Sequence, residues 1–175
     1  MHINPQIRRI APFASAMAGF VVLANVLVAF PINDFLTWGV LPYPITFLIV
    51  DLANRHGGPR FATTITACGF AIALPLSLWL AEPRIAVASL LAYVAGQAMD
   101  ISVFHHLRRG AWWKAPLVSS CLAVSVDSLL FFALAFAGTG VNWVPLCAGD
   151  TAVKLFIVLF GLTFYRRMTL KMGHE

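Results

Sequence analysis

Six long apolar runs constrain this chain more than any other feature of its sequence. A helix needs about 20 predominantly apolar residues to cross the hydrocarbon core of a bilayer. The runs are separated by short polar or proline-containing turns and lie at residues 13–30, 36–50, 61–80, 85–104, 115–137 and 144–165. The sequence therefore predicts an all-α membrane protein with six transmembrane helices.

The proportion of charged residues supports this interpretation. Only 11% of the residues are charged and 60% are hydrophobic, whereas a soluble domain has about 25% charged residues. No low-complexity segment and no linker divides the chain. We expect residues 1–175 to form a single integral membrane domain.

If the chain crosses the membrane six times, its basic residues are distributed unevenly between the two sides of the membrane. Ten of the 12 lysines and arginines are expected on the side of the termini, at positions 8, 9, 55, 60, 108, 109, 114, 166, 167 and 171. Arg84 is expected on the opposite side, and Lys154 lies inside a run. Cytoplasmic loops carry such an excess, so both termini should be cytoplasmic, in a multi-pass protein of the cytoplasmic (inner) membrane. The net charge of +5 then indicates membrane topology and not a nucleic-acid partner.

The second run contains Pro42-Tyr43-Pro44. Proline lacks a backbone N–H and disrupts a helix, so we expect this span to be broken or kinked there. Broken membrane helices are tolerated where their backbone is buried in protein or lines a cavity. This segment should therefore face the interior of the bundle.

Four polar residues fall near the middle of different spans. Asn25, Gln97, Asp127 and Lys154 lie roughly ten to twelve residues from the start of their runs, which corresponds to about 15–18 Å of helix. That is about half of the ~30 Å hydrocarbon core. The sequence thus predicts one polar layer at the midplane, built from four helices.

Two carboxylates flank this layer. Asp150 lies one turn before Lys154, and Asp100 follows Gln97 by three residues. A purely structural ion pair between Asp150 and Lys154 is one interpretation, and a helix–helix hydrogen bond is one for Gln97. A carboxylate inside a span is costly and usually marks a site or pathway. Asp51 lies nearer the cytoplasmic surface, where a role at a helix end is as plausible as ligand contact.

Motifs of enzymes and metal centres are missing. There is no HExxH helix, no GxSxG and no glycine-rich phosphate loop, so we expect neither catalysis nor ATP hydrolysis by the chain itself. His105 and His106 lack a partner motif for a metal, and the three cysteines stand singly in apolar runs. We predict no cofactor and no metal.

Several stretches together resemble the queuosine precursor transporters, a vitamin-uptake-like family. They lie at residues 37–39, 44–52, 92–109, 112–116, 127–132 and 150–154, and include Gln97-Ala-Met-Asp100, Asp127-Ser128 and Asp150-Thr-Ala-Val-Lys154. The resemblance implies import of 7-deazaguanine bases, such as queuine or 7-cyano-7-deazaguanine, into the cytoplasm. It also implies a six-helix fold similar to the substrate-binding subunits of energy-coupling-factor vitamin transporters.

The polar residues suit such a ligand chemically. A 7-deazaguanine ring presents an N–H and an amino group side by side, which one carboxylate can accept together, and Asp127 or Asp100 is the candidate. The ring carbonyl needs a donor, for which the candidates are Asn25, Gln97 and Lys154. The flat ring needs an aromatic partner, for which the candidates are Phe47, Tyr93, Phe131 and Phe132.

Three classes of function remain open at this point. The leading hypothesis is a transporter that binds the base at the midplane, with proton coupling through Asp100 or Asp150. The alternative is the substrate-binding subunit of an energy-coupling-factor-type uptake complex. The four-residue spacing of Ala14 and Ala18 allows close helix approach, either within the chain or to a homodimer or energising membrane partner. The third class is an intramembrane enzyme or assembly factor.

Overall fold

The computed structural model describes residues 5–27, 30–33 and 36–172. Its helices are α1 (Pro5–Leu27), α2 (Tyr43–Leu80), α3 (Pro83–Leu107), α4 (Lys114–Phe136) and α5 (Trp143–Met172). Between α1 and α2 lie the short strands β1 (Pro31–Asn33) and β2 (Leu36–Thr37), which pair antiparallel, and the 3₁₀ helix η1 (Trp38–Val40). Within the described ranges, five helices are long and apolar enough to cross a membrane. The all-α class is therefore confirmed.

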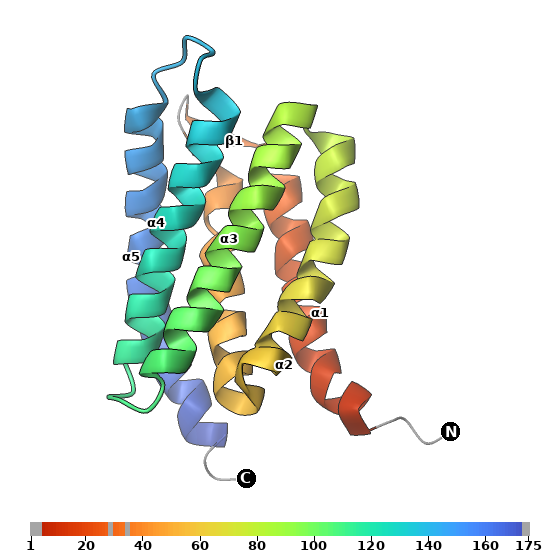
Figure 1. Cartoon of the computed structure of the whole chain (residues 1–175), viewed down its shortest axis with the longest axis vertical. Helices are drawn as coiled ribbons and strands as arrows, with labels where there is room; N and C mark the ends of the chain where they lie inside the picture. Colours follow the sequence, from red (N-terminus) through yellow and green to blue (C-terminus); the bar gives the residue numbers. More distant parts are fainter. Residues whose placement is uncertain (1–4, 28–29, 34–35, 173–175) are drawn as a thin grey trace.

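Helix α2 is interrupted near its middle. Gly58 has non-helical angles (φ 79°, ψ −176°), and Pro59 follows it. Figure 1 shows the two parts of α2 running in opposite directions from a turn at the end of the molecule where both termini lie. Residues 43–57 and 59–80 are thus two antiparallel helical segments.

The structure corrects the start of the second predicted span. Residues 36–42 were predicted to be α-helical, but they form β2, the 3₁₀ helix η1 and a turn. The α-helix α2 begins only at Tyr43. Pro44 stands in the first turn of the helix, where the missing N–H of proline breaks no helical hydrogen bond. The two prolines therefore start a helix here and do not kink one. Residues 28 and 29 of the predicted first span lie outside the described residues.

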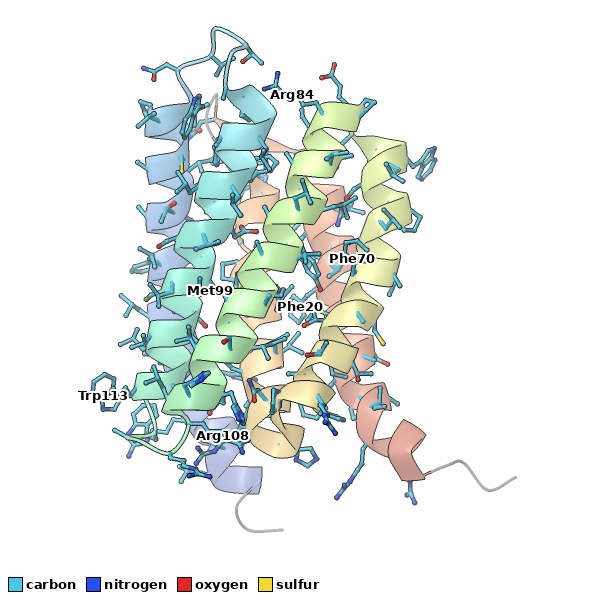
Figure 2. The ribbon with its side chains drawn as sticks, in the orientation of Figure 1. Phe20, Phe70, Arg84, Met99, Arg108 and Trp113 are labelled. Atoms are coloured by element: carbon cyan, nitrogen blue, oxygen red, sulfur yellow. The ribbon has the colours of Figure 1, made fainter. Side chains whose placement is uncertain are left out.

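The helices form one bundle (Figure 1). Helix α3 packs against α4 and α2, α1 packs against α2, and α5 packs against α4 and α2. Arg108 and Trp113 lie at the end of the bundle that holds the termini, and Arg84 lies at the opposite end (Figure 2). Arg84 donates hydrogen bonds to the carbonyl oxygens of Leu134 (2.9 Å) and Ala137 (2.5 Å), which places a cation at the C-terminal end of α4, where a helix favours it.

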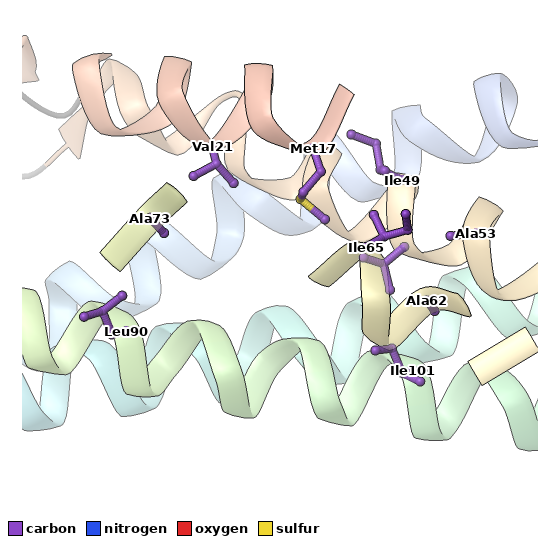
Figure 3. Packing of buried hydrophobic residues seen from close by; sticks show 10 residues of the cluster. Met17, Val21, Ile49, Ala53, Ala62, Ile65, Ala73, Leu90 and Ile101 are labelled. Carbon is purple, nitrogen blue, oxygen red and sulfur yellow. The ribbon is translucent and has the colours of Figure 1, made fainter. Parts of the chain in front are cut away.

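Small and branched side chains fill the contact between α1, α2 and α3. Met17, Ile65 and Ile101 belong to this apolar cluster, as Figure 3 shows. By contrast, Trp79, Phe156 and Phe160 on the outside are 82%, 70% and 75% exposed. An outer surface of large apolar side chains around a partly polar interior is the arrangement that a lipid solvent favours.

Candidate functional site

A buried ion-pair network joins α4 and α5. The ammonium Nζ of Lys154 lies 3.1 Å from Asp127 Oδ2 and 2.7 Å from Asp150 Oδ2. All three residues are at most 9% exposed. Ser128 donates a 2.7 Å hydrogen bond to Asp150 Oδ2 and accepts one from Lys154 at 3.2 Å.

Tyr43 connects this network to α2. Its hydroxyl donates a 2.8 Å hydrogen bond to Asp127 Oδ1, and Lys154 Nζ lies 5.0 Å from the centroid of its ring. We call Tyr43, Asp127, Ser128, Asp150 and Lys154 the central polar cluster. Two carboxylates face one ammonium there, so the cluster has one more acidic than basic group.

Local sequence explains how three helices supply this cluster. Asp150 and Lys154 are one turn apart on α5 and so share a face. Tyr43 is the first residue of α2, at the break in the second apolar run. Gly96 lets α3 approach closely, because a Cβ placed there would lie 3.1 Å from Asp127 Cβ and 3.4 Å from the Ala123 carbonyl oxygen.

Gln97 adds an amide next to the central polar cluster. Its Nε2 donates to Thr46 Oγ1 (3.2 Å), and Thr46 donates in turn to the Tyr43 carbonyl oxygen (2.7 Å). Gln97 is fully buried, and its Oε1 has no hydrogen-bond partner among the described residues. Phe47 is also fully buried, and its ring stands edge-on to that of Tyr43, with centroids 5.8 Å apart. Gln97 and Phe47 thus lie beside the cluster.

Asn25 lies apart from the ion pairs but shares a small cavity with Tyr43. Its Nδ2 donates to the Val21 carbonyl oxygen (2.9 Å), and its Oδ1 accepts from Ser77 (3.3 Å). The cavity measures about 20 Å³ and is also lined by Tyr93. Asn25 therefore borders the polar interior without a direct hydrogen bond to a charged group.

The three other predicted aromatic residues, Tyr93, Phe131 and Phe132, make their contacts elsewhere. The Tyr93 hydroxyl donates to the Thr66 carbonyl oxygen at 3.1 Å, across to the second segment of α2. The ring of Phe131 pairs with Phe132 (centroids 5.1 Å apart) and Phe136 (6.2 Å) near the end of α4. These contacts leave Phe47 and Tyr43 as the rings that adjoin the ion pairs.

Asp100 belongs to a second buried group, which we call the acidic pair: Asp51 and Asp100, with Ser119 and Ser120 beside them. Asp51 and Asp100 are 1% and 0% exposed and interact electrostatically. Ser119 and Ser120 donate hydrogen bonds of 3.2 Å each to the two oxygens of Asp51. Neither oxygen of Asp100 has a hydrogen-bond partner in the described part of the chain.

Sequence reasoning missed part of this arrangement. Tyr43 and Thr46 were not predicted as site residues, although the break at Pro42 and Pro44 indicated that this segment faces the interior. Asp51, for which the sequence left open a role at a helix end or in ligand contact, is buried and accepts hydrogen bonds from two serines. That Asp51, on the first segment of α2, faces serines on α4 could have been inferred only from how the helices pack.

Comparisons with known proteins agree on one family. Residues 76–168 match the family described as "Putative vitamin uptake transporter". The queuosine precursor transporter of Escherichia coli (strain K12) is 32% identical over a 175-residue alignment that covers 81% of this chain and 78% of that protein. A "Probable queuosine precursor transporter" of Haemophilus influenzae is 33% identical over 157 residues, covering 71% of this chain and 66% of that protein. No solved structure matches the chain.

Proposed function

The chain belongs to the vitamin uptake transporter family, and from this premise we propose that it imports queuosine precursors into the cytoplasm. Its substrates would be 7-deazaguanine bases such as queuine or 7-cyano-7-deazaguanine, the class implied by the names of its relatives. The observation that carries the proposal is the central polar cluster. Three charged side chains from two helices are buried together beside an amide and two aromatic rings, inside an apolar bundle where buried charges are costly and usually mark a site.

The topology of the proposed transporter has six crossings. The turn at Gly58 divides α2 into two antiparallel segments, which with the four other helices give an even number of crossings. Both termini then lie on the cytoplasmic side of the inner membrane, together with the loops that carry most of the arginines, as the positive-inside rule requires.

The groups of the cluster complement a 7-deazaguanine base. Asp127 would accept the adjacent N–H and amino groups of the ring, and Lys154 would donate to its carbonyl oxygen. The Oε1 of Gln97, which has no hydrogen-bond partner among the described residues, would accept a further N–H. Asn25 would complete the polar rim. Phe47 and Tyr43 would border the flat ring, whereas Tyr93 and Phe131 make their contacts elsewhere.

Without a base, the charges of the cluster satisfy one another through Lys154. Binding then exchanges an internal ion pair for contacts with the base. A base that lacks the amino group would leave a buried carboxylate without its donor, and sites of this kind discriminate strongly.

The acidic pair would couple transport to protons. Two buried carboxyl groups in contact repel each other when both are ionised. Asp51 and Asp100 would share one proton, which neutralises one of the two buried carboxyl groups. Loss and gain of that proton would accompany alternating access.

Replacing Asp127 tests the proposal directly. Cells that cannot synthesise queuosine precursors would be fed queuine or 7-cyano-7-deazaguanine, and queuosine in their tRNA would be measured with and without this chain. Asp127→Asn should reduce the signal at least tenfold, because a neutral amide offers only one acceptor. Ser125→Ala is the matched control, since Ser125 lies on the same helix, exposed, with its hydroxyl bonded to the Cys121 carbonyl oxygen. Wild-type uptake by Asp127→Asn, with normal amounts in the membrane, would contradict the assignment.

A substrate-binding subunit that needs an energising partner is the second candidate. Ala14 packs against the apolar core, but Ala11, Ser15 and Gly19 form an exposed stripe of small residues on α1, and a Cβ on Gly19 would meet nothing within 4 Å. Such a stripe permits close approach of another helix. Uptake by the purified chain alone in liposomes, without ATP, would exclude this candidate.

A further inference from the structure

A groove separates α1 from α5 at the end of the bundle that holds the termini. It has a volume of about 1170 Å³. One face of the first segment of α2 forms its floor, through Ile45, Leu48, Ile49 and Leu52, while α1 and α5 form its walls. The groove lies outside both the central polar cluster and the acidic pair, because none of their members lines it.

The length of the groove matches one leaflet of a bilayer. Its α5 wall extends from Phe156 to Met168, which is roughly 18 Å at 1.5 Å per residue. Half of the hydrocarbon core is about 15 Å. Along this wall Phe156, Phe160 and Phe164 are 70%, 75% and 52% exposed, so no part of the described chain covers them.

The mouth of the groove is basic. Arg8 and Arg9 on α1, Arg167 on α5 and His56 on α2 line it. Within the described residues, ion pairs are formed only by Lys154, so these arginines have no carboxylate partner there. Their position at the helix ends is where the phosphates of a leaflet lie.

We propose that this groove binds an anionic phospholipid of the bilayer. Its acyl chains lie along the phenylalanine wall and the floor of α2, and its phosphate is held between Arg8, Arg9 and Arg167. A lipid in this place bridges α1 and α5, which otherwise pack mainly on α2 and on α4. Basic pockets between membrane helices bind anionic headgroups by the same chemistry.

Charge favours a lipid over a second copy of the chain. A second copy packed in the same orientation would bring its own basic end, with Arg8, Arg9 and Arg167, against the same arginines. Like charges brought together in this way repel each other, whereas the phosphate of a lipid neutralises the arginines.

The test measures lipid-dependent stability of the purified full chain in detergent. The thermal unfolding midpoint is followed as phosphatidylglycerol or phosphatidylcholine is added, and phosphatidylglycerol alone should raise it. The triple variant Arg8→Gln, Arg9→Gln, Arg167→Gln should weaken the apparent affinity for phosphatidylglycerol on the order of 100-fold, from about one kcal/mol for each arginine. The matched control is Arg60→Gln, Arg109→Gln, Lys114→Gln, which removes equal charge from exposed positions outside the groove and should retain the affinity.

A second variant fills the groove and keeps its charge. A Cβ on Gly161 would come no closer than 4.0 Å to Leu48 Cδ2, so Gly161→Phe should fold normally and lower the affinity at least tenfold. Equal effects of the two lipids, or equal losses in the groove variant and the control, would overturn the proposal. Dimerisation that Gly161→Phe abolishes, with an unchanged lipid response, would instead assign the groove to contacts between copies and would also overturn it. None of these measurements uses transport, so they are independent of the proposed substrate.

Discussion

Gly96 shows how one missing side chain positions the proposed site. It lies where α3 meets α4, and a Cβ there would be 3.1 Å from Asp127 Cβ and 3.4 Å from both the Ala123 carbonyl oxygen and Phe47 Cζ. Backbone atoms cannot yield as the end of a flexible side chain can. The spacing of these helices therefore depends on glycine at this position.

We predict that Gly96→Val destabilises the protein by about 1–3 kcal/mol, the usual effect of overpacking. The measurement is thermal unfolding of the purified chain in detergent. Gly19→Val is the control, because nothing lies within 4 Å of a Cβ there. Equal midpoints for the two variants would show that α3 and α4 do not need this close approach.

Replacing Asp100 distinguishes a role of this residue in transport from a role in stability. Because its carboxyl group is fully buried beside that of Asp51, the neutral and similarly sized Asn should remove their repulsion and be tolerated. We predict that Asp100→Asn keeps or raises the unfolding midpoint but removes the response of uptake to external pH. Uptake assays between pH 5.5 and 8 would check this, with exposed Ser102→Ala on the same helix as control. A wild-type pH response in Asp100→Asn would contradict proton coupling at this residue.

At the scale of elements, the reversal inside α2 depends on Gly58. Its angles (φ 79°, ψ −176°) lie in a region that is almost restricted to glycine. We predict that Gly58→Ala destabilises the protein by roughly 1–3 kcal/mol and exposes the turn to protease. Gly149→Ala, on α5 with open space around the added Cβ, should be neutral. If both variants unfold at the same temperature, the turn does not require the glycine conformation.

At the scale of the whole molecule, the proposed topology of six crossings can be tested by labelling. In a chain whose three cysteines are replaced by alanine, a cysteine at Thr139, between α4 and α5, should react with a membrane-impermeant maleimide in spheroplasts. A cysteine at Gly110, between α3 and α4, should react only after the membrane is permeabilised. Both positions are exposed, so access to the reagent decides the outcome. Equal labelling of both sites in intact spheroplasts would contradict the topology.

The sequence by itself determined the helices and the identity of most polar residues in the interior. Apolar run length and the positions of proline and glycine are local properties, so they predicted the helices from residue 59 onward closely. The prolines at 42 and 44 indicated a break in the second run but not its form. Proline can mark either the start of a helix or a kink within one, and the local sequence does not distinguish the two. The rise per residue of a helix also predicted one membrane depth for Gln97, Asp127 and Lys154. Such a depth requires only the number of residues between each position and the start of its span.

Only the tertiary structure decided which polar groups meet. Rotation of each helix about its axis depends on side-chain packing, such as the close approach at Gly96, and no count of residues gives it. Packing joined Asp127 to Lys154 and Tyr43, and it placed Asp100 against Asp51 instead of the central polar cluster. It also left the groove between α1 and α5, because the space between two helices that barely touch is a property of the bundle and of neither helix alone.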